Sequence, residues 1–166
     1  LARVVAHCRR YGTAKIGIQL AHAGRKASAQ RPWEGSQALG AGEDPWETIA
    51  PSAIAFGPKW PTPREMTTDD MARVRDGFVQ AAKRAVRAGI DAIELHGAHG
   101  YLLHSFISPI SNRRSDGYGG SLTARMRFPL EIAQAVRAAV PKGMPLGARI
   151  TGNDWSEGGL TPDDAV

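Results

Sequence analysis

Apolar positions along this chain of 166 residues fall into short continuous runs and into longer stretches with a period of three to four. Three short runs, at residues 15–20, 91–96 and 145–150, predict buried strands. Stretches with helical periodicity separate the runs. Strands that alternate with amphipathic helices indicate βαβ units, so the pattern predicts an α/β fold with a parallel sheet.

Three stretches have the periodicity of amphipathic helices. The first, residues 1–11, spaces Val4, Val5, Cys8 and Tyr11 helically and is expected to stop at Gly12. The second begins at a cap on Thr67 or Thr68 and ends at Gly89. Its apolar stripe consists of Met71, Val74, Phe78, Ala82 and Ala85. The third, residues 122–139, is expected to place Met126, Leu130, Ala133 and Val136 on one face.

Residues 27–65 form a long irregular stretch between the first predicted strand and the second predicted helix. The stretch contains three of the four tryptophans, Trp33, Trp46 and Trp60, and six of the eleven prolines. Loops of this length are usually functional or disordered. Because tryptophan side chains carry large apolar surfaces, we expect this loop to be packed and ordered.

Both ends of the sequence have the pattern of helices that continue beyond it. The chain opens in helical periodicity without a capping residue. It closes on Thr161-Pro162-Asp163-Asp164, which is typical of the first turn of a helix. We therefore expect an internal part of a longer chain, with residues 1–166 forming a single partial domain truncated at both ends.

Composition narrows the class of protein. Hydrophobic residues make up 42% of the chain, enough for a core, and no apolar run approaches the roughly 18 residues of a membrane span. Cys8 is the only cysteine, so no disulfide can form within the chain. The first residues lack the pattern of a signal peptide. We expect a soluble, cytoplasmic protein that does not bind membranes.

The net charge of +5 raises the question of nucleic-acid binding. The basic residues of the second predicted helix are mixed with Asp69, Asp70 and Asp76, which is typical of a solvated helix face. No basic block with interleaved aromatic residues occurs. We therefore expect no nucleic-acid partner.

Polar residues lie at or just beyond the end of each predicted strand where active residues of parallel α/β folds lie. Solvated loops would also be polar there, so position alone does not separate the two explanations. The residues are Gln19, His22, Arg25 and Lys26 for the first strand, Glu94, His96, His99 and Tyr101 for the second, and Arg149, Asn153 and Asp154 for the third.

His96 and His99 lie three residues apart in a glycine-containing turn, which could bring both imidazoles to one point. Two ring N–H groups there could bind one carbonyl or phenolate oxygen. Tyr101 is close enough to join them, and a phenol can donate a proton. A metal site that adds His104 or Glu94 is an alternative, but no zinc-binding pattern supports it. A purely structural histidine is another.

Three segments resemble one family of flavoenzymes, in the same order and at the same separations. The run HGAHGYLLHSFISPISNRRSDGYGGS (residues 96–121) resembles the Old Yellow Enzyme family. GIQLAHAGRKA (residues 17–27) and GARITGNDW (residues 147–155) resemble the third and fifth strands of that family. The long loop and His99 are similar to the subclass of bacterial NADPH dehydrogenases and xenobiotic reductases.

The resemblance implies a fold, a cofactor and roles for five residues. The fold would be a (β/α)8 TIM barrel that binds FMN, of which this chain would supply roughly strands three to five. Gln19 would hydrogen-bond the flavin ring edge, and Arg149 would lie beside flavin N1 and O2. His96 and His99 would bind the carbonyl oxygen of the substrate, and Tyr101 would donate the proton. No metal is implied.

The function that the resemblance implies is an FMN-dependent NAD(P)H oxidoreductase. NADPH, or NADH, would reduce FMN, and flavin N5 would pass hydride to the C=C bond of a small α,β-unsaturated carbonyl compound. The complete protein would be a homo-oligomer. Two alternatives stay open: a dienoyl-CoA reductase or amine dehydrogenase-like protein with a downstream iron–sulfur cluster, and a non-catalytic fragment unable to hold flavin.

Overall fold

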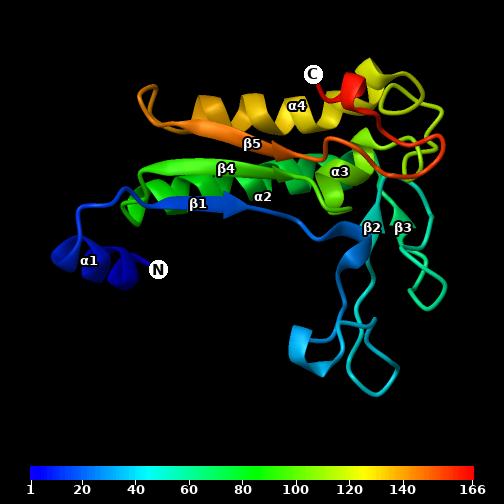
Figure 1. Ribbon diagram of the computed structural model, residues 1–166, viewed down its shortest axis with the longest axis horizontal. Helices are drawn as coiled ribbons and strands as arrows, with labels where there is room; N and C mark the ends of the chain where they lie inside the picture. Colours follow the sequence, from blue (N-terminus) through cyan, green and yellow to red (C-terminus); the bar gives the residue numbers. More distant parts are fainter.

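The computed structural model describes residues 1–166, and its centre is a parallel three-stranded sheet. The strands are β1 (Gly17–Leu20), β4 (Ala92–Gly97) and β5 (Leu146–Ile150), in the order β1-β4-β5. Figure 1 shows the three strands running in the same direction. The three predicted strands and the parallel sheet are confirmed.

Helices α2 (Thr68–Arg87) and α4 (Leu122–Ala139) pack side by side on one face of the sheet (Figure 1). Helix α1 (Ala2–Tyr11) lies near the amino end of β1, where Arg9 donates a hydrogen bond to the carbonyl of Gly89 at 2.6 Å. Helix α1 ends at Gly12 as predicted, but only Val5 of its apolar residues is buried.

The stripe predicted for α2 is confirmed, because all five of its residues are buried in the main core. Thr67 caps the helix by accepting a hydrogen bond from the amide of Asp70 at 3.1 Å. The carboxylate of Asp70 in turn accepts a hydrogen bond from the amide of Thr67 at 2.9 Å, which completes a capping box. Gly89 follows the helix with a φ of 84°, a conformation that glycine adopts without strain.

The face predicted for α4 was wrong in part: Val136 is buried and Ala133 packs against the core as predicted, but Leu130 is not buried. The helix buries Phe128, Ile132 and Val136, spaced four residues apart, whereas Leu130 is 48% exposed. Phe128 packs against Phe106 with ring centroids 4.6 Å apart. The buried face packs against α2 and against α3 (Leu102–Ile107), a six-residue helix that was not predicted and in which every residue is buried.

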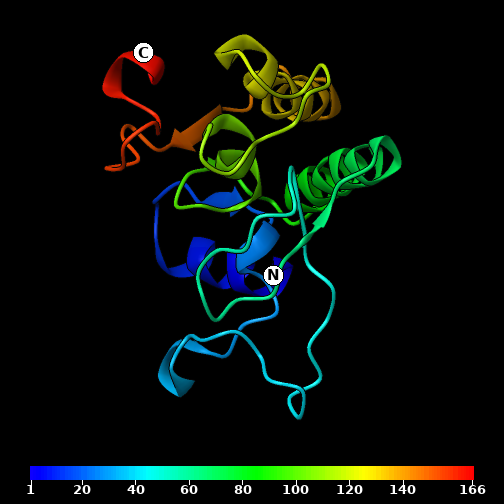
Figure 2. The same cartoon turned by 90° about the vertical axis from the view of Figure 1, so that its right-hand side faces the viewer.

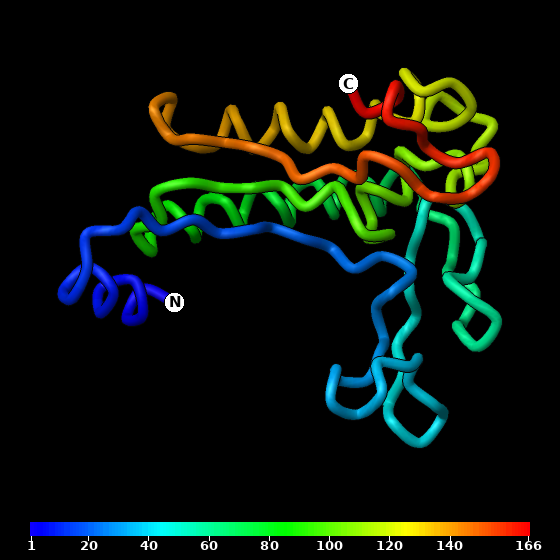
Figure 3. The backbone as a smooth tube through the Cα atoms, viewed as in Figure 1, coloured from blue at the N-terminus to red at the C-terminus, as the bar shows by residue number.

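The short 3-10 helix η1 (Gly24–Lys26) precedes the long loop, which contains η2 (Pro32–Glu34) and the paired strands β2 (Ile49–Ala50) and β3 (Arg64–Glu65). The segment between η1 and β2 extends away from the rest of the chain (Figure 3). Its backbone is tied by Gln30 and Leu39, whose amides donate to Gln37 and Ser28. The expected packing of its tryptophans was wrong for two of them, since Trp33 is 79% and Trp46 57% exposed.

The chain ends in η3 (Pro162–Asp164), which begins with the predicted capping arrangement. The carboxylate of Asp164 accepts hydrogen bonds from the amide and the hydroxyl of Thr161 at 2.8 and 2.9 Å. No helix in the structure is long and apolar enough to cross a membrane.

Candidate functional site

The carboxyl ends of β1, β4 and β5 meet at one edge of the sheet, which faces the viewer in Figure 2. Gln19 pairs in register with Glu94, and His96 pairs with Arg149. Side chains of paired residues leave a parallel sheet on the same side. These four polar side chains therefore share one face, and Ile18, Leu20, Ile93 and Leu95 point the other way, toward the helices.

His96, His99 and Tyr101 form a compact cluster beside this face. The ring centroid of His96 is 5.0 Å from that of His99 and 5.1 Å from that of Tyr101. The turn after β4 creates this proximity, because His99 and Gly100 both adopt left-handed backbone conformations, with φ of 59° and 74°. The structure thus confirms that the turn brings both imidazoles and the phenol together.

His96 is the most enclosed member of the cluster. Its residue surface is 3% exposed, and its Nδ1 atom is buried without a hydrogen-bond partner in the chain. Burial lowers the pKa of the His96 imidazole, and the nearby His99 and Arg149 act in the same direction. The His96 imidazole is therefore neutral at pH 7, and its buried Nδ1 atom is free to bond to a ligand. A buried polar atom without a partner costs free energy unless a ligand or water satisfies it.

Arg149 and Gln19 offer complementary hydrogen-bonding groups on the same face. The guanidinium of Arg149 is exposed and takes part in none of the ion pairs of the chain. Gln19 donates through Nε2 to the carboxylate of Glu94, which leaves its amide oxygen free to accept. Arg149 on β5 and Gln19 on β1 offer a cation and an amide acceptor on one face, which suit a heterocycle that carries both carbonyl oxygens and a ring N–H. The residues present therefore fit a flavin ring.

The other polar residues at the strand ends mainly bind the chain itself. His22 accepts a hydrogen bond from the amide of Gly24 at 3.1 Å, and Arg25 donates to the carbonyls of Ile54 and Ala55 at 3.1 and 3.2 Å. Lys26 lies closer to the cluster, with Nζ 5.2 Å from the ring centroid of Tyr101.

His104, one of the two residues considered as a further metal ligand, contacts Asp154 through Nε2 at 2.9 Å. No group of three or more His, Cys, Asp or Glu side chains is placed to hold a metal ion. The arrangement that the metal alternative needed is therefore not formed.

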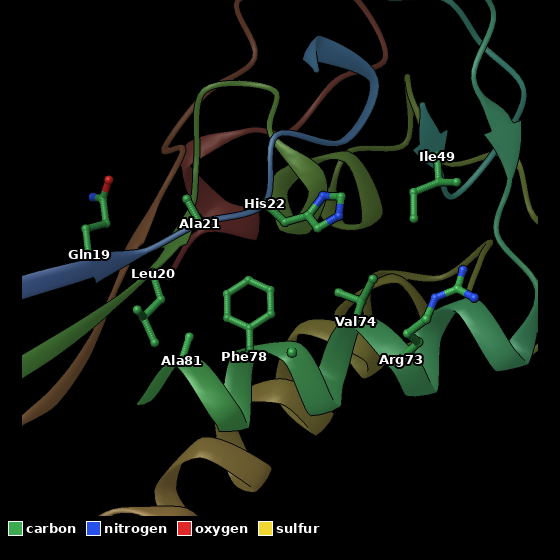
Figure 4. Close-up of a pocket in the computed structure, with 10 residues that line it drawn as sticks. Gln19, Leu20, Ala21, His22, Ile49, Arg73, Val74, Phe78 and Ala81 are labelled. Atoms are coloured by element: carbon green, nitrogen blue, oxygen red, sulfur yellow. The ribbon is translucent and has the colours of Figure 1, made fainter. Parts of the chain in front are cut away.

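Two hollows adjoin the edge of the sheet. One, of about 500 Å³, lies between the end of β1 and helix α2 (Figure 4). Leu20 and Phe78 point into it, whereas the Gln19 side chain points away. Its lining is largely apolar and includes none of the clustered histidines. The second, of about 560 Å³, lies between the turn after β4 and the loop after β5, and His99, Arg149 and Asn153 line it. The second hollow is therefore the one that adjoins the cluster of His96, His99 and Tyr101.

Two residues that contact the turn after β4, Thr151 and Ser105, were not identified from the sequence. Thr151 accepts a hydrogen bond from the amide of His99 at 3.1 Å, and Ser105 donates one to the carbonyl of Gly100 at 3.2 Å. Nothing in the motif itself marks these side chains. The position of Thr151 directly after β5 is the one signal that could have suggested it.

The parallel sheet, its helical layer and this polar edge define part of a (β/α)8-barrel enzyme whose site lies at the carboxyl ends of the strands. A model of the NADH:flavin oxidoreductase / NADH oxidase family matches residues 2–165. An NADPH dehydrogenase of Clostridium acetobutylicum is 44% identical over 167 residues, covering 100% of this chain and 45% of that protein. The chain belongs to the NADH:flavin oxidoreductase / NADH oxidase family.

Solved structures agree with this assignment. Histamine dehydrogenase from Rhizobium sp. 4-9 matches with a TM-score of 0.79 and 30% identity, over 99% of this chain and 23% of that one. Morphinone reductase matches with a TM-score of 0.72 and 32% identity, over 90% of this chain and 41% of that one. The predicted TIM-barrel fold class is thereby confirmed.

The family and the names of its members agree with the predicted oxidoreductase class and with FMN and a nicotinamide nucleotide as the predicted cofactor and reductant. The chain spans less than half the length of the curated relatives it matches, 36%, 45% and 40% for three of them.

Proposed function

We propose that the complete protein is an FMN-dependent NAD(P)H oxidoreductase that reduces the C=C bond of α,β-unsaturated carbonyl compounds. The observation that carries the proposal is the His96–His99–Tyr101 cluster beside the face that bears Gln19 and Arg149. Arg149 and Gln19 would hold the flavin ring. The chemistry that bound FMN supplies is two-electron transfer as hydride, from NADPH or NADH to the substrate.

The two imidazoles supply the polarising part of the site. With its pKa lowered by burial, His96 is a neutral donor, and its enclosed position makes any hydrogen bond to a carbonyl oxygen strong. His99 lies close enough to donate to the same oxygen. Drawing electrons toward that oxygen makes the β-carbon of a conjugated carbonyl compound electrophilic, so it can accept hydride.

Tyr101 supplies the proton. Its ring lies beside His96, so a substrate held by the imidazoles would extend past the phenol. Hydride at the β-carbon leaves negative charge on the α-carbon and the oxygen, and the phenol proton neutralises it at the α-carbon. An α,β-unsaturated carbonyl compound of this kind is a small molecule. We also propose that the complete protein forms a homo-oligomer.

A double variant of the complete, FMN-loaded protein tests the proposal. Because removing one donor to a developing oxyanion costs about 10²–10³ in rate, His96→Ala with His99→Ala should lower enone turnover by at least about 10²-fold. Phenol binding should be lost, while the FMN content stays at the wild-type level. His7→Ala, an exposed histidine of α1, is the matched control and should behave as wild type. Unchanged enone turnover in the double variant would refute the assignment.

A second candidate is an amine dehydrogenase-like or acyl-CoA reductase-like protein with an iron–sulfur cluster. The fold match to histamine dehydrogenase favours it, but that protein is 30% identical, whereas the NADPH dehydrogenase of Clostridium acetobutylicum is 44% identical over the whole chain. The NADPH dehydrogenase class is therefore better supported. Iron analysis of the complete protein separates the two, since the first proposal expects FMN without stoichiometric iron.

A further inference from the structure

The turn that carries the catalytic cluster is held in a costly conformation. His99 has a φ of 59°, which non-glycine residues rarely adopt, and Gly100 follows with a φ of 74°. A left-handed residue that carries a side chain is strained and persists only where its surroundings hold it. The contacts that hold this turn therefore decide where the imidazole of His99 and the phenol of Tyr101 lie.

Two side chains from other strand ends hold the backbone of His99. Its amide donates to the hydroxyl of Thr151, directly after β5, at 3.1 Å. Its carbonyl accepts from Nζ of Lys26, in η1 after β1, at 3.0 Å. The amine of Lys26 also lies 4.5 Å from the ring centroid of Phe56. The polar backbone atoms of His99 are thus used by segments that follow β1 and β5.

Two side chains of α3 hold the backbone of Gly100. Its amide donates to Nδ1 of His104 at 2.7 Å, and its carbonyl accepts from the hydroxyl of Ser105 at 3.2 Å. Every polar backbone atom of the two left-handed residues therefore has a side-chain partner. Three of the four partners, Thr151, Lys26 and Ser105, are neutral or cationic side chains. The fourth, His104, also contacts Asp154.

The imidazole of His104 joins the turn to the loop after β5. Because Nδ1 accepts from Gly100, the ring proton lies on Nε2, which donates to Oδ1 of Asp154 at 2.9 Å. The side chains of His104 and Asp154 are only 10% and 7% exposed. The other carboxylate oxygen accepts from the hydroxyl of Ser108 at 2.6 Å and from the amide of Leu160 at 2.9 Å. The carboxylate is thus fixed from three directions.

We propose that His104 and Asp154 form a positioning pair that clamps the turn at His99 and Gly100 onto the loop after β5. This inference rests on the proposed function, because it assigns the pair the task of aligning His99 and Tyr101 with Arg149. Neither residue of the pair needs to touch substrate. His104 must be neutral to accept from Gly100, and burial favours that state by lowering its pKa, against the opposing effect of Asp154.

Variants of the complete, FMN-loaded protein test the clamp. His104→Ala leaves the Gly100 amide without its acceptor. His104→Asn restores an acceptor near the position of Nδ1 but is too short to reach Asp154, and Asp154→Asn removes the carboxylate while keeping the size. The matched controls are His7→Asn and Asp163→Asn, at exposed positions. The readouts are amide hydrogen exchange across residues 96–101, phenol affinity by calorimetry, and kcat with an enone.

His104→Ala should accelerate exchange at residues 99–101, weaken phenol binding and lower kcat by about 10-fold to 100-fold, because small misplacements of reacting groups cost that much. His104→Asn keeps the acceptor but loses the link to Asp154, so it should recover only part of the exchange protection, and Asp154→Asn should likewise lie between wild type and His104→Ala. If His104→Ala does not fold, the same comparison is made between His104→Asn, Asp154→Asn and their controls. Wild-type exchange and phenol affinity in all of the folded variants would overturn the clamp.

The exchange measurement separates this inference from the proposed function. If the wild-type protein neither reduces enones nor binds phenols, the proposed function is wrong, and exchange at residues 99–101 still reports whether His104 holds the turn. If enones are reduced and exchange is unaffected by the variants, the function stands and the clamp is wrong.

Discussion

His96 on β4 and Arg149 on β5 are direct partners in the parallel register of the sheet. Their side chains consequently leave the same face, the imidazole buried and the guanidinium exposed. The positive charge of Arg149 contributes, after burial, to lowering the pKa of His96. One register pair thus joins the group expected to polarise the substrate to the cation expected beside the flavin.

The first prediction concerns Arg149. A hydrogen bond to a charged group is worth about 1.5–3 kcal/mol, so Arg149→Ala in the complete protein should weaken FMN binding by about 10-fold or more. Reduction by NADPH should slow as well, because a cation no longer stabilises negative charge on the reduced ring. FMN release measured by fluorescence and stopped-flow reduction check both effects.

Arg149→Lys keeps the charge and should retain part of the affinity, although it loses the planar fork. Arg87→Ala, at an exposed position of α2, provides the control for loss of one cation. An FMN affinity of Arg149→Ala equal to that of Arg87→Ala would show that Arg149 does not contact the cofactor.

The second prediction concerns the face of α4. Ile132 is fully buried and Leu130 is 48% exposed. Truncating a buried isoleucine costs about 2–5 kcal/mol, so Ile132→Ala should lower the free energy of unfolding by that amount. Leu130→Ala should change it by less than about 0.5 kcal/mol, as surface substitutions usually do. Urea unfolding of the two variants measures the difference, and equal losses would mean that the helix buries the face first predicted.

The third prediction concerns pH. Burial lowers the pKa values of His22, His96 and His104 in the folded protein, so the unfolded chain binds more protons as the pH falls below its ordinary histidine pKa of about 6.5. Stability should therefore be complete above pH 7 and decline as the pH falls through 6.5 toward the lower folded values.

Urea midpoints measured between pH 7.5 and 5.5 check this dependence. His104→Asn removes one of the three titrating groups, so its midpoint should fall less steeply with pH than that of the wild-type protein. A wild-type midpoint that stays constant or rises over this interval would contradict the prediction.

Much of the site could be predicted because its parts are close in sequence. His96, His99 and Tyr101 lie within six residues, so a single turn brings the rings of His99 and Tyr101 to about 5 Å from that of His96. The strands and the stripe of α2 were predicted for a related reason, since their periodicity is complete within each element. Gln19 and Arg149 were among the polar residues that the rule for carboxyl ends of parallel strands brings together, and only the resemblance to the flavoenzyme family singled them out.

Features that depend on a distant partner could not be predicted. Helix α3 has six residues, all buried, and so presents no amphipathic pattern. Trp33 and Trp46 of the long loop are exposed, although their large apolar side chains favoured burial. A tryptophan is buried only where another part of the chain offers a surface to pack against. The pairing of His104 with Asp154 joins residues 50 positions apart, and a sequence does not record which polar groups meet across that separation.

Four features follow from the order of amino acids alone: the alternation of helix and strand, the parallel sheet, the polar residues at the strand ends and the clustering of His96 with Tyr101. Each of these depends on local spacing or on a general rule of parallel sheets. Only the tertiary structure decided which face of α4 is buried and which side chains hold the left-handed turn at His99 and Gly100. Apolar periodicity shows which residues of a helix or strand could be buried. Which of them are buried depends on the element that packs against it.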